Sequence, residues 1–305
     1  MSQNAPPLRP GSAELRSRIM ASTELRLGSS VINLTPGNRE KVIQCISAIE
    51  LFSKRDGAVW GNDGDSLRVA IRGINLTIDN IEDCYIVNEI FGHGTYDIGM
   101  PGDVHVIDIG ANLLIASLHF AKMEKVRKVT AFEPLKPTLE KACHHLSLNP
   151  GLAEKIELHA FGLSDSDKTI FVPFTHAIKG ATRTDSDWES NPHLQNRPGY
   201  EKQEAPLRKA SKTIGEVIAS SACRNFILKA DCEGAETAIF QDLQEHGLLE
   251  KFSMILLEWH GQNREALENM LDSSNFQRVS FKPQGKPDLG MIYAFNTRVA
   301  PAILP

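Results

Sequence analysis

Residues 104–114, VHVIDIGANLL, constrain the fold of this chain more than any other stretch. An apolar run carries one acid, Asp108, near its end, and Gly110 and Asn112 follow before a second apolar stretch begins. This order predicts a buried parallel strand, a tight turn and a helix, the arrangement that seats a nucleotide-like cofactor. Glycine allows the turn to lie close to a ligand, and the first N–H groups of the helix can receive an anionic group.

A second acid stands at the end of the next predicted strand. The run VTAFEP (129–134) contains Glu133, 25 positions after Asp108. An acid at this place can accept hydrogen bonds from both hydroxyls of a ribose. The turn lacks the further glycines of a dinucleotide fingerprint, so Asp108 and Glu133 favour S-adenosylmethionine over a dinucleotide. The alternative is that residues 104–121 are an ordinary buried strand and helix of an α/β domain.

Composition excludes several classes of function. The net charge of −5 over 305 residues gives no electrostatic reason to expect nucleic acid or an anionic membrane as a partner. The five cysteines lack C-x-x-C spacing, which argues against a zinc site or a disulfide framework. The apolar segment 104–121 is interrupted by polar residues and is therefore not expected to span a membrane. With no apolar leader in the first residues, we expect a cytoplasmic protein.

The chain is expected to have three regions. Residues 1–30 are rich in Pro, Ser and Gly and predict a flexible tail. Residues 31–100 predict a helix followed by a small β segment, which could serve as a lid. Residues 101–298 predict the main domain, with a polar insertion at 175–210 that would face the substrate.

Strands and helices alternate through the main domain. Strand patterns within 155–165, 225–236 and 253–261 are separated by helical patterns, which predicts an α/β fold with a mostly parallel sheet covered on both faces. The last two strands, joined by a short turn, predict an antiparallel edge pair. Phe161 ends one of these strands, where it could support a purine or simply belong to the core.

Polar residues at the carboxyl ends of parallel strands converge on one edge of the sheet. We therefore expect Asp231, Glu258 and His260 to form the catalytic group. His260 is the best general base by its ordinary pKa, with Asp231 second. The same three residues could hold a divalent metal, but two carboxylates and one imidazole suit Mg²⁺ or Mn²⁺ only moderately, so a metal is not favoured. Glu233 and Glu236 are most simply explained as charges at a helix N-terminus.

Five motifs follow one another in order between residues 104 and 260: VIDIGANLLIASL, TAFEP, HAFGLSD, FILKADCEGAE and ILLEWH. In these motifs the chain resembles the FkbM-type family of S-adenosylmethionine-dependent methyltransferases. The resemblance implies a Rossmann-like class I methyltransferase fold with a seven-stranded sheet, and O-methylation of a sugar or natural-product hydroxyl. Residues 1–100 are not covered by it.

The resemblance also implies roles for individual residues. Asp108, Gly110 and Asn112 fall in the cofactor loop, Glu133 at the ribose and Asp231 on the acceptor side. Leu114 is the main departure, because the family usually has a second glycine there.

We therefore expect an S-adenosylmethionine-dependent O-methyltransferase acting on a small hydroxylated molecule or glycan. Two alternatives stay open: a non-catalytic scaffold that binds S-adenosylmethionine, and an NAD-dependent oxidoreductase. The acceptor and the oligomeric state are not encoded in any recognisable motif.

Overall fold

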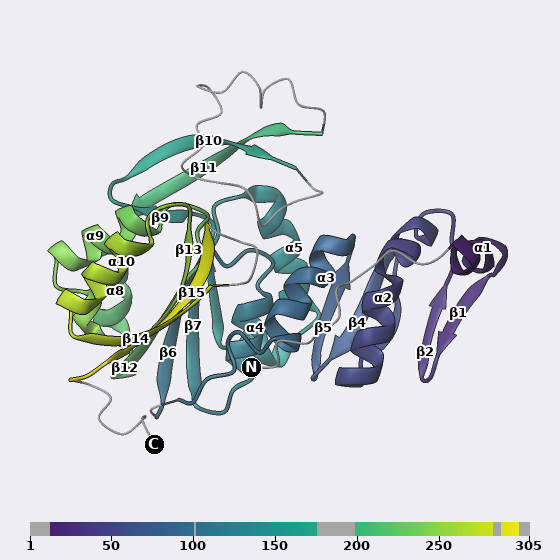
Figure 1. Ribbon diagram of the computed structural model, residues 1–305, viewed down its shortest axis with the longest axis horizontal. Helices are drawn as coiled ribbons and strands as arrows, with labels where there is room; N and C mark the ends of the chain where they lie inside the picture. The colour runs from purple at the N-terminus through teal and green to yellow at the C-terminus, as the bar shows by residue number, and fades with distance from the viewer. Residues whose placement is uncertain (1–12, 101, 176–198, 283–287, 299–305) are drawn as a thin grey trace. The chain divides into compact units, whose positions relative to one another are not determined.

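The computed structural model describes residues 13–100, 102–175, 199–282 and 288–298 (Figure 1). The chain divides into two compact units. The first takes in residues up to 97 together with 144–150, and the second takes in 98–143 and 151 onward. Among the described residues, no helix is long and apolar enough to span a membrane.

The second unit is built on a seven-stranded sheet. In spatial order its strands are β14 (Phe276–Phe281), β15 (Leu289–Asn296), β13 (Phe252–His260), β12 (Asn225–Ala230), β6 (Val104–Ile109), β7 (Val126–Phe132) and β8 (Ile156–His159). Strand β15 is antiparallel to both of its neighbours, and the other pairs are parallel. The predicted α/β fold, a seven-stranded and mostly parallel sheet with antiparallel pairing at its C-terminal edge, is confirmed.

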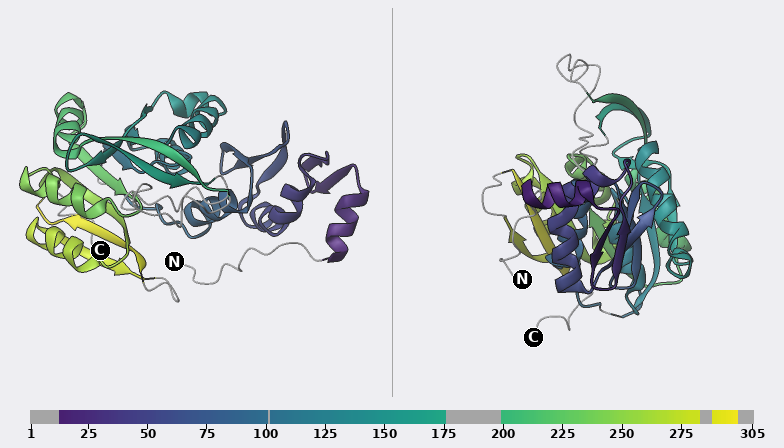
Figure 2. Two further views of the ribbon diagram at one scale, coloured as in Figure 1. Left: turned by 90° about the horizontal axis from the view of Figure 1, so that it is seen from above. Right: turned by 90° about the vertical axis from the view of Figure 1, so that its right-hand side faces the viewer.

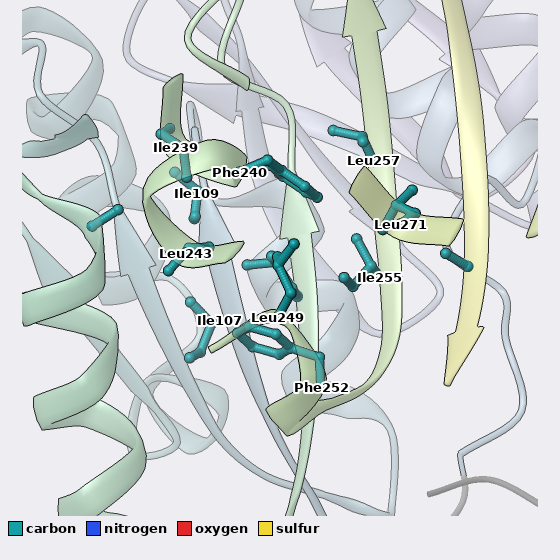
Figure 3. Packing of buried hydrophobic residues seen from close by; sticks show 14 of the residues in the cluster. Ile107, Ile109, Ile239, Phe240, Leu243, Leu249, Phe252, Ile255, Leu257 and Leu271 are labelled. Carbon is teal, nitrogen blue, oxygen red and sulfur yellow. The ribbon is translucent and has the colours of Figure 1, made fainter. Parts of the chain in front are cut away.

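Helices cover both faces of this sheet, which is why its central strands are apolar on both sides. Helices α8 (Ala210–Ser220), α9 (Glu236–Glu245) and α10 (Arg264–Ser273) lie on one face, and α4 (Ile115–Lys122) and α5 (Lys136–Ser147) on the other (Figures 1 and 2). All six residues of β6 are buried. Figure 3 shows the core between this sheet and α9 and α10, with Ile107, Ile109, Phe240, Leu243 and Leu271 among its side chains. Each such side chain stabilises the fold by about 1.5–3 kcal/mol relative to exposure.

The direction in which successive strands are added to the sheet reverses at β6. Strands β7 and β8 extend it in one direction, and β12 and β13 extend it in the other. Ligands of open α/β sheets bind at such a switch point, beyond the carboxyl ends of the strands. The loops after β6, β7 and β12 meet there: Gly110 N–H donates to Phe132 O (3.1 Å), and Asp231 N–H donates to Ile109 O (3.1 Å).

A small second sheet occupies part of the predicted insertion. Strands β10 (Lys168–Phe174), β11 (Glu201–Lys209) and β9 (Gly162–Ser164) form it in that order, and it continues from the end of β8 (Figures 1 and 2). The predicted insertion over 175–210 therefore includes a regular strand, β11, and its place on the substrate side stays a prediction. Only alternate residues of β11, Ala205 and Leu207, are buried, so its sequence looks polar. Residues 176–198 lie outside the described part.

The first unit contains the predicted helix, α2 (Arg39–Asp56), and the predicted strand pair, β4 (Ser66–Ile71) and β5 (Ile74–Ile78). A third strand, β3 (Val59–Asp63), pairs with β4. Helix α3 (Ile81–Val87) and the π-helix η1 (Asn88–Gly92) follow. That this unit serves as a lid stays a prediction.

Residues 13–33 differ from the expected tail. They form helix α1 (Ala13–Ala21) and a hairpin of β1 (Glu24–Leu27) and β2 (Ser30–Asn33). The turn of the hairpin contains Gly28, whose φ of 58° suits glycine. The prediction of a flexible tail over residues 1–30 is therefore wrong for residues 13–30, and residues 1–12 lie outside the described part.

Candidate functional site

The turn after β6 leaves no room for a side chain at Gly110. Its φ is 76°, and a Cβ built there would lie 1.8 Å from the backbone oxygen of Asp231. The Lys229 ammonium donates to Gly110 O at 2.7 Å and ties the same two loops together. The close approach of the loops after β6 and β12 therefore depends on a glycine at this position.

Asp108 has different contacts from those expected of a ligand-binding acid. It is fully buried, its Oδ1 lies 3.1 Å from Lys229 Nζ, and its Oδ2 accepts a hydrogen bond from Ser117 Oγ at 2.6 Å. Burial alone would lower the pKa of Lys229, but the carboxylates of Asp108 and Asp231 outweigh it and raise the pKa. These contacts hold Lys229 and α4 in place, and the predicted place of Asp108 in the cofactor loop stays a prediction.

Glu133 follows β7 directly and is held by backbone groups. Its Oε2 accepts the Asn112 N–H and its Oε1 accepts the Leu135 N–H, both at 3.0 Å. Burial raises the pKa of Glu133 to about 7, although these two hydrogen bonds act against the increase. Each carboxylate oxygen has a second lone pair, so Glu133 can still accept a pair of hydroxyls.

Asn112 and Leu114 both adopt the left-handed conformation, with φ values of 48° and 62°. Within the described part of the chain, the buried Oδ1 of Asn112 has no hydrogen-bond partner, so it can accept one from a ligand. Leu114 is fully buried and caps the start of α4. The chain therefore keeps at Leu114 the backbone conformation that glycine adopts most easily, at a strain of about 1–2 kcal/mol.

Phe161 lies among aromatic and cationic side chains. Its ring centroid is 5.5 Å from that of Phe132 and 5.3 Å from that of His159, and the Arg208 guanidinium lies 4.5 Å from it. The ring is only partly buried. Its role under a purine stays a prediction, and a purine on the face that Arg208 covers would have to displace the guanidinium.

The three predicted catalytic residues lie together around the imidazole of His260. The Nδ1 atom is 3.0 Å from Glu236 Oε1. The Nε2 atom lies 3.5 Å from Glu233 Oε2, 3.9 Å from Asp231 Oδ1 and 4.0 Å from Glu258 Oε1. The sequence indicates charge compensation at a helix N-terminus as the simplest role of Glu233 and Glu236, whereas the structure places both beside His260. The spacing of the three acids in DCEGAE is the one signal that could have placed all of them here.

The charge of this cluster argues against the predicted role of His260 as the general base. Burial alone would lower the pKa of His260, but the hydrogen bond with Glu236 and the nearby carboxylates of Glu233 and Asp231 raise it to about 9. The imidazole therefore holds a proton on both nitrogens at neutral pH. A general base needs a free lone pair, so the geometry favours Asp231 over His260 for that task.

Comparison with known proteins identifies the fold's family. The model of the methyltransferase FkbM domain matches residues 108–280. The AMB antimetabolite synthetase AmbE of Pseudomonas aeruginosa is 28% identical over 234 residues, covering 67% of this chain but 10% of that protein. The methyltransferase sdnD of Sordaria araneosa is 25% identical over 231 residues, covering 69% of this chain and 88% of that protein.

Among solved structures, the methyltransferase FkbM of Methylobacillus flagellatus KT is similar to 84% of this chain and 60% of its own, at 13% identity and a TM-score of 0.43. The family model alone spans more than half of the chain, including the end of β6, Glu133, and the whole acid–imidazole cluster. The chain therefore belongs to the FkbM family of methyltransferases.

Proposed function

We propose that the chain is an S-adenosylmethionine-dependent methyltransferase that methylates a hydroxyl of a sugar or a natural-product-like small molecule. The observation that carries the proposal is the position of the Glu133 carboxylate. It stands at the end of β7, next to the switch point of the sheet, with both oxygens oriented by backbone N–H groups. A carboxylate fixed in this way is suited to accept the two hydroxyls of one ribose.

The neighbouring residues support this cofactor. Gly110 lets the loops after β6 and β12 meet closely, Glu133 would hold the ribose, and the Oδ1 of Asn112, without a partner among the described residues, offers an acceptor for the cofactor's ammonium group. When bound, S-adenosylmethionine supplies a sulfonium methyl group whose carbon is open to attack by an acceptor oxygen.

Asp231 is the residue of this chain best placed to handle the acceptor. It follows β12, its side chain is 29% exposed, and Lys229 fixes one of its oxygens at 3.8 Å. Asp231 would orient the acceptor hydroxyl and take its proton, a task that positioned carboxylates perform in general-base catalysis. The acids around it disfavour an anionic acceptor, which supports a neutral small molecule or glycan over nucleic acid.

Calorimetry tests the cofactor assignment. We expect S-adenosylhomocysteine to bind the wild-type chain and NAD to give no heat. Glu133→Ala should weaken the binding of S-adenosylhomocysteine at least about tenfold, because a hydrogen bond to a charged group is worth about 1.5–3 kcal/mol. Glu157→Ala removes an exposed acid of β8 and serves as the control. Absence of heat with S-adenosylhomocysteine in the wild type would refute the proposal.

Turnover tests whether the protein is an enzyme or a scaffold. We would measure the release of S-adenosylhomocysteine with a panel of hydroxylated acceptors, for the wild type and for Asp231→Ala. The proposal expects turnover with at least one acceptor and a large loss in the variant. Binding of S-adenosylhomocysteine with no turnover on any acceptor would favour a scaffold, and equal rates would remove Asp231 from the reaction.

A further inference from the structure

The Nε2 atom of His260 faces three carboxylates at distances longer than an ordinary hydrogen bond. The side chain is 9% exposed. Its Nε2 lies 3.5–4.0 Å from carboxylate oxygens of Glu233, Asp231 and Glu258. These distances are longer than the 2.7–3.2 Å of an ordinary N–H···O hydrogen bond. Atoms at these separations can both coordinate one small cation placed between them.

The opposite side of the ring is fixed by Glu236. This carboxylate is fully buried, and it also accepts the N–H groups of Cys232 and Gly234 at 3.0 Å. Glu236 therefore fixes the ring and the loop that carries Asp231 and Glu233 with the same contacts. A histidine that binds a metal through one nitrogen almost always donates its other N–H to such a group.

The loop brings the acids to the same place as the ring. Glu233 adopts a left-handed φ of 51°, a conformation that few non-glycine residues hold without a reason. One ligand atom each from Asp231, Glu233 and His260 lie within 4.8 Å of one another. The side chains of Asp231 and Glu233 are 29% and 27% exposed, so both can rotate the short distance needed to close around an ion.

We propose that Asp231, Glu233 and His260 bind one divalent cation, which displaces the proton from His260 Nε2, with Glu236 as the group that positions the histidine through the other ring nitrogen. Two carboxylates supply the hard oxygen ligands that Mg²⁺ and Mn²⁺ prefer, and the imidazole nitrogen shifts the preference from Mg²⁺ toward Mn²⁺. The exposed side of the site leaves coordination positions for water or an acceptor hydroxyl. The inference rests on the proposed function for its role: the cation would lower the pKa of the hydroxyl that is methylated.

Manganese binding can be measured without cofactor or acceptor. The full-length protein would be treated with EDTA, desalted and titrated with MnCl₂, and free Mn²⁺ would be followed by its room-temperature electron paramagnetic resonance signal. We expect one Mn²⁺ per chain. Asp231→Asn and Glu233→Gln should each raise the Kd at least about tenfold, because each removes a charged ligand, and Glu236→Gln should raise it about 10–100-fold. Glu265→Gln, an exposed acid of α10, should leave the Kd unchanged.

Circular dichroism and the melting temperature of each variant would confirm that it is folded. Two of the variants change partly exposed side chains and should fold like the wild type. No bound Mn²⁺ at millimolar concentration, or the same Kd in all variants, would overturn the inference. If S-adenosylhomocysteine binds in EDTA while Mn²⁺ does not bind, the metal site falls and the proposed function stands. If Mn²⁺ binds and S-adenosylhomocysteine does not, the metal site stands and the proposed function falls.

Discussion

At the scale of single residues, Gly110 carries the strictest geometric requirement of the site. Gly110→Ala would place a methyl group against the Asp231 carbonyl in a left-handed backbone. We expect the variant to lose roughly 2–4 kcal/mol of unfolding free energy and to bind S-adenosylhomocysteine much more weakly. Gly151→Ala is the control, because nothing lies within 4 Å of its Cβ position. Urea unfolding measures the unfolding free energy of both variants. Equal stability would contradict the close approach of Gly110 to the Asp231 carbonyl.

Leu114 presents two opposing effects at one residue. Leu114→Gly would relieve about 1–2 kcal/mol of left-handed strain but would leave a cavity in place of a fully buried side chain, which costs about 2–5 kcal/mol. We therefore expect a net destabilisation of roughly 1–3 kcal/mol. Leu118→Ala, in the same helix and also fully buried, should be more destabilising because no strain is relieved. A Leu114→Gly variant more stable than the wild type in urea would show that strain dominates.

At the scale of elements, Glu133 joins the loop after β6 to the end of β7, and its ionisation should affect cofactor binding. Hydroxyls donate more strongly to the carboxylate than to the neutral acid. With a pKa of about 7, Glu133 is mostly protonated at pH 6 and mostly ionised at pH 8. We expect the Kd for S-adenosylhomocysteine to fall about tenfold from pH 6 to pH 8. Calorimetry at both values checks this, and Glu133→Gln should bind weakly with little dependence on pH.

The sequence predicted some elements and missed others for physical reasons. β6, β7, β12 and β13 bury most residues of both faces and are rich in apolar side chains, so each stands out in the sequence as a buried run. β3 and β11 bury only one face, and the short β1 and β2 bury little, so their composition resembles that of loops. The positions of polar residues at the predicted strand ends also indicated where the site lies, because the carboxyl ends of parallel strands meet at one edge of a sheet.

Side-chain partners were harder to predict than strands. The ion pair between Asp108 and Lys229 is not visible in the sequence, because the two residues stand 121 positions apart. Glu236 reads as a helix charge because its hydrogen bond with His260 depends on the register between β12 and β13. Pairings of this kind follow from tertiary packing, which no local pattern contains.

At the scale of the whole molecule, His105 couples the stability of the fold to pH. Its ring nitrogens lie 2.9 Å from Ser221 Oγ and 2.8 Å from Thr130 Oγ1, so it joins β6 to β7 and to the end of α8. Burial, with a contribution from Lys128, lowers its pKa from 6.5 to about 4. The unfolded chain therefore binds this proton first as pH falls. The stability that the neutral ring contributes is complete above pH 6.5 and is lost toward pH 4.

We expect His105 to reduce the unfolding free energy by roughly 2–3 kcal/mol between pH 7 and pH 4.5. Urea unfolding at several pH values would measure the loss. Comparison with His105→Gln isolates this group, since all other titrating residues are shared. The variant should be less stable at pH 7 and should lose less on acidification. Parallel pH profiles for the two chains would show that His105 does not titrate on unfolding.

The order of strands in the sheet has a consequence for how the protein is made. Val104 of β6 pairs with Asn225 of β12, 121 residues further along the chain. A ribosome adding 5–20 residues per second needs roughly 6–24 s to cover that distance. During this time one edge of β6, a strand that is entirely buried in the folded protein, has no partner, and such edges promote aggregation. The nascent chain is thus most exposed to misassembly, and most dependent on chaperones, while the segment between the two central strands is being translated.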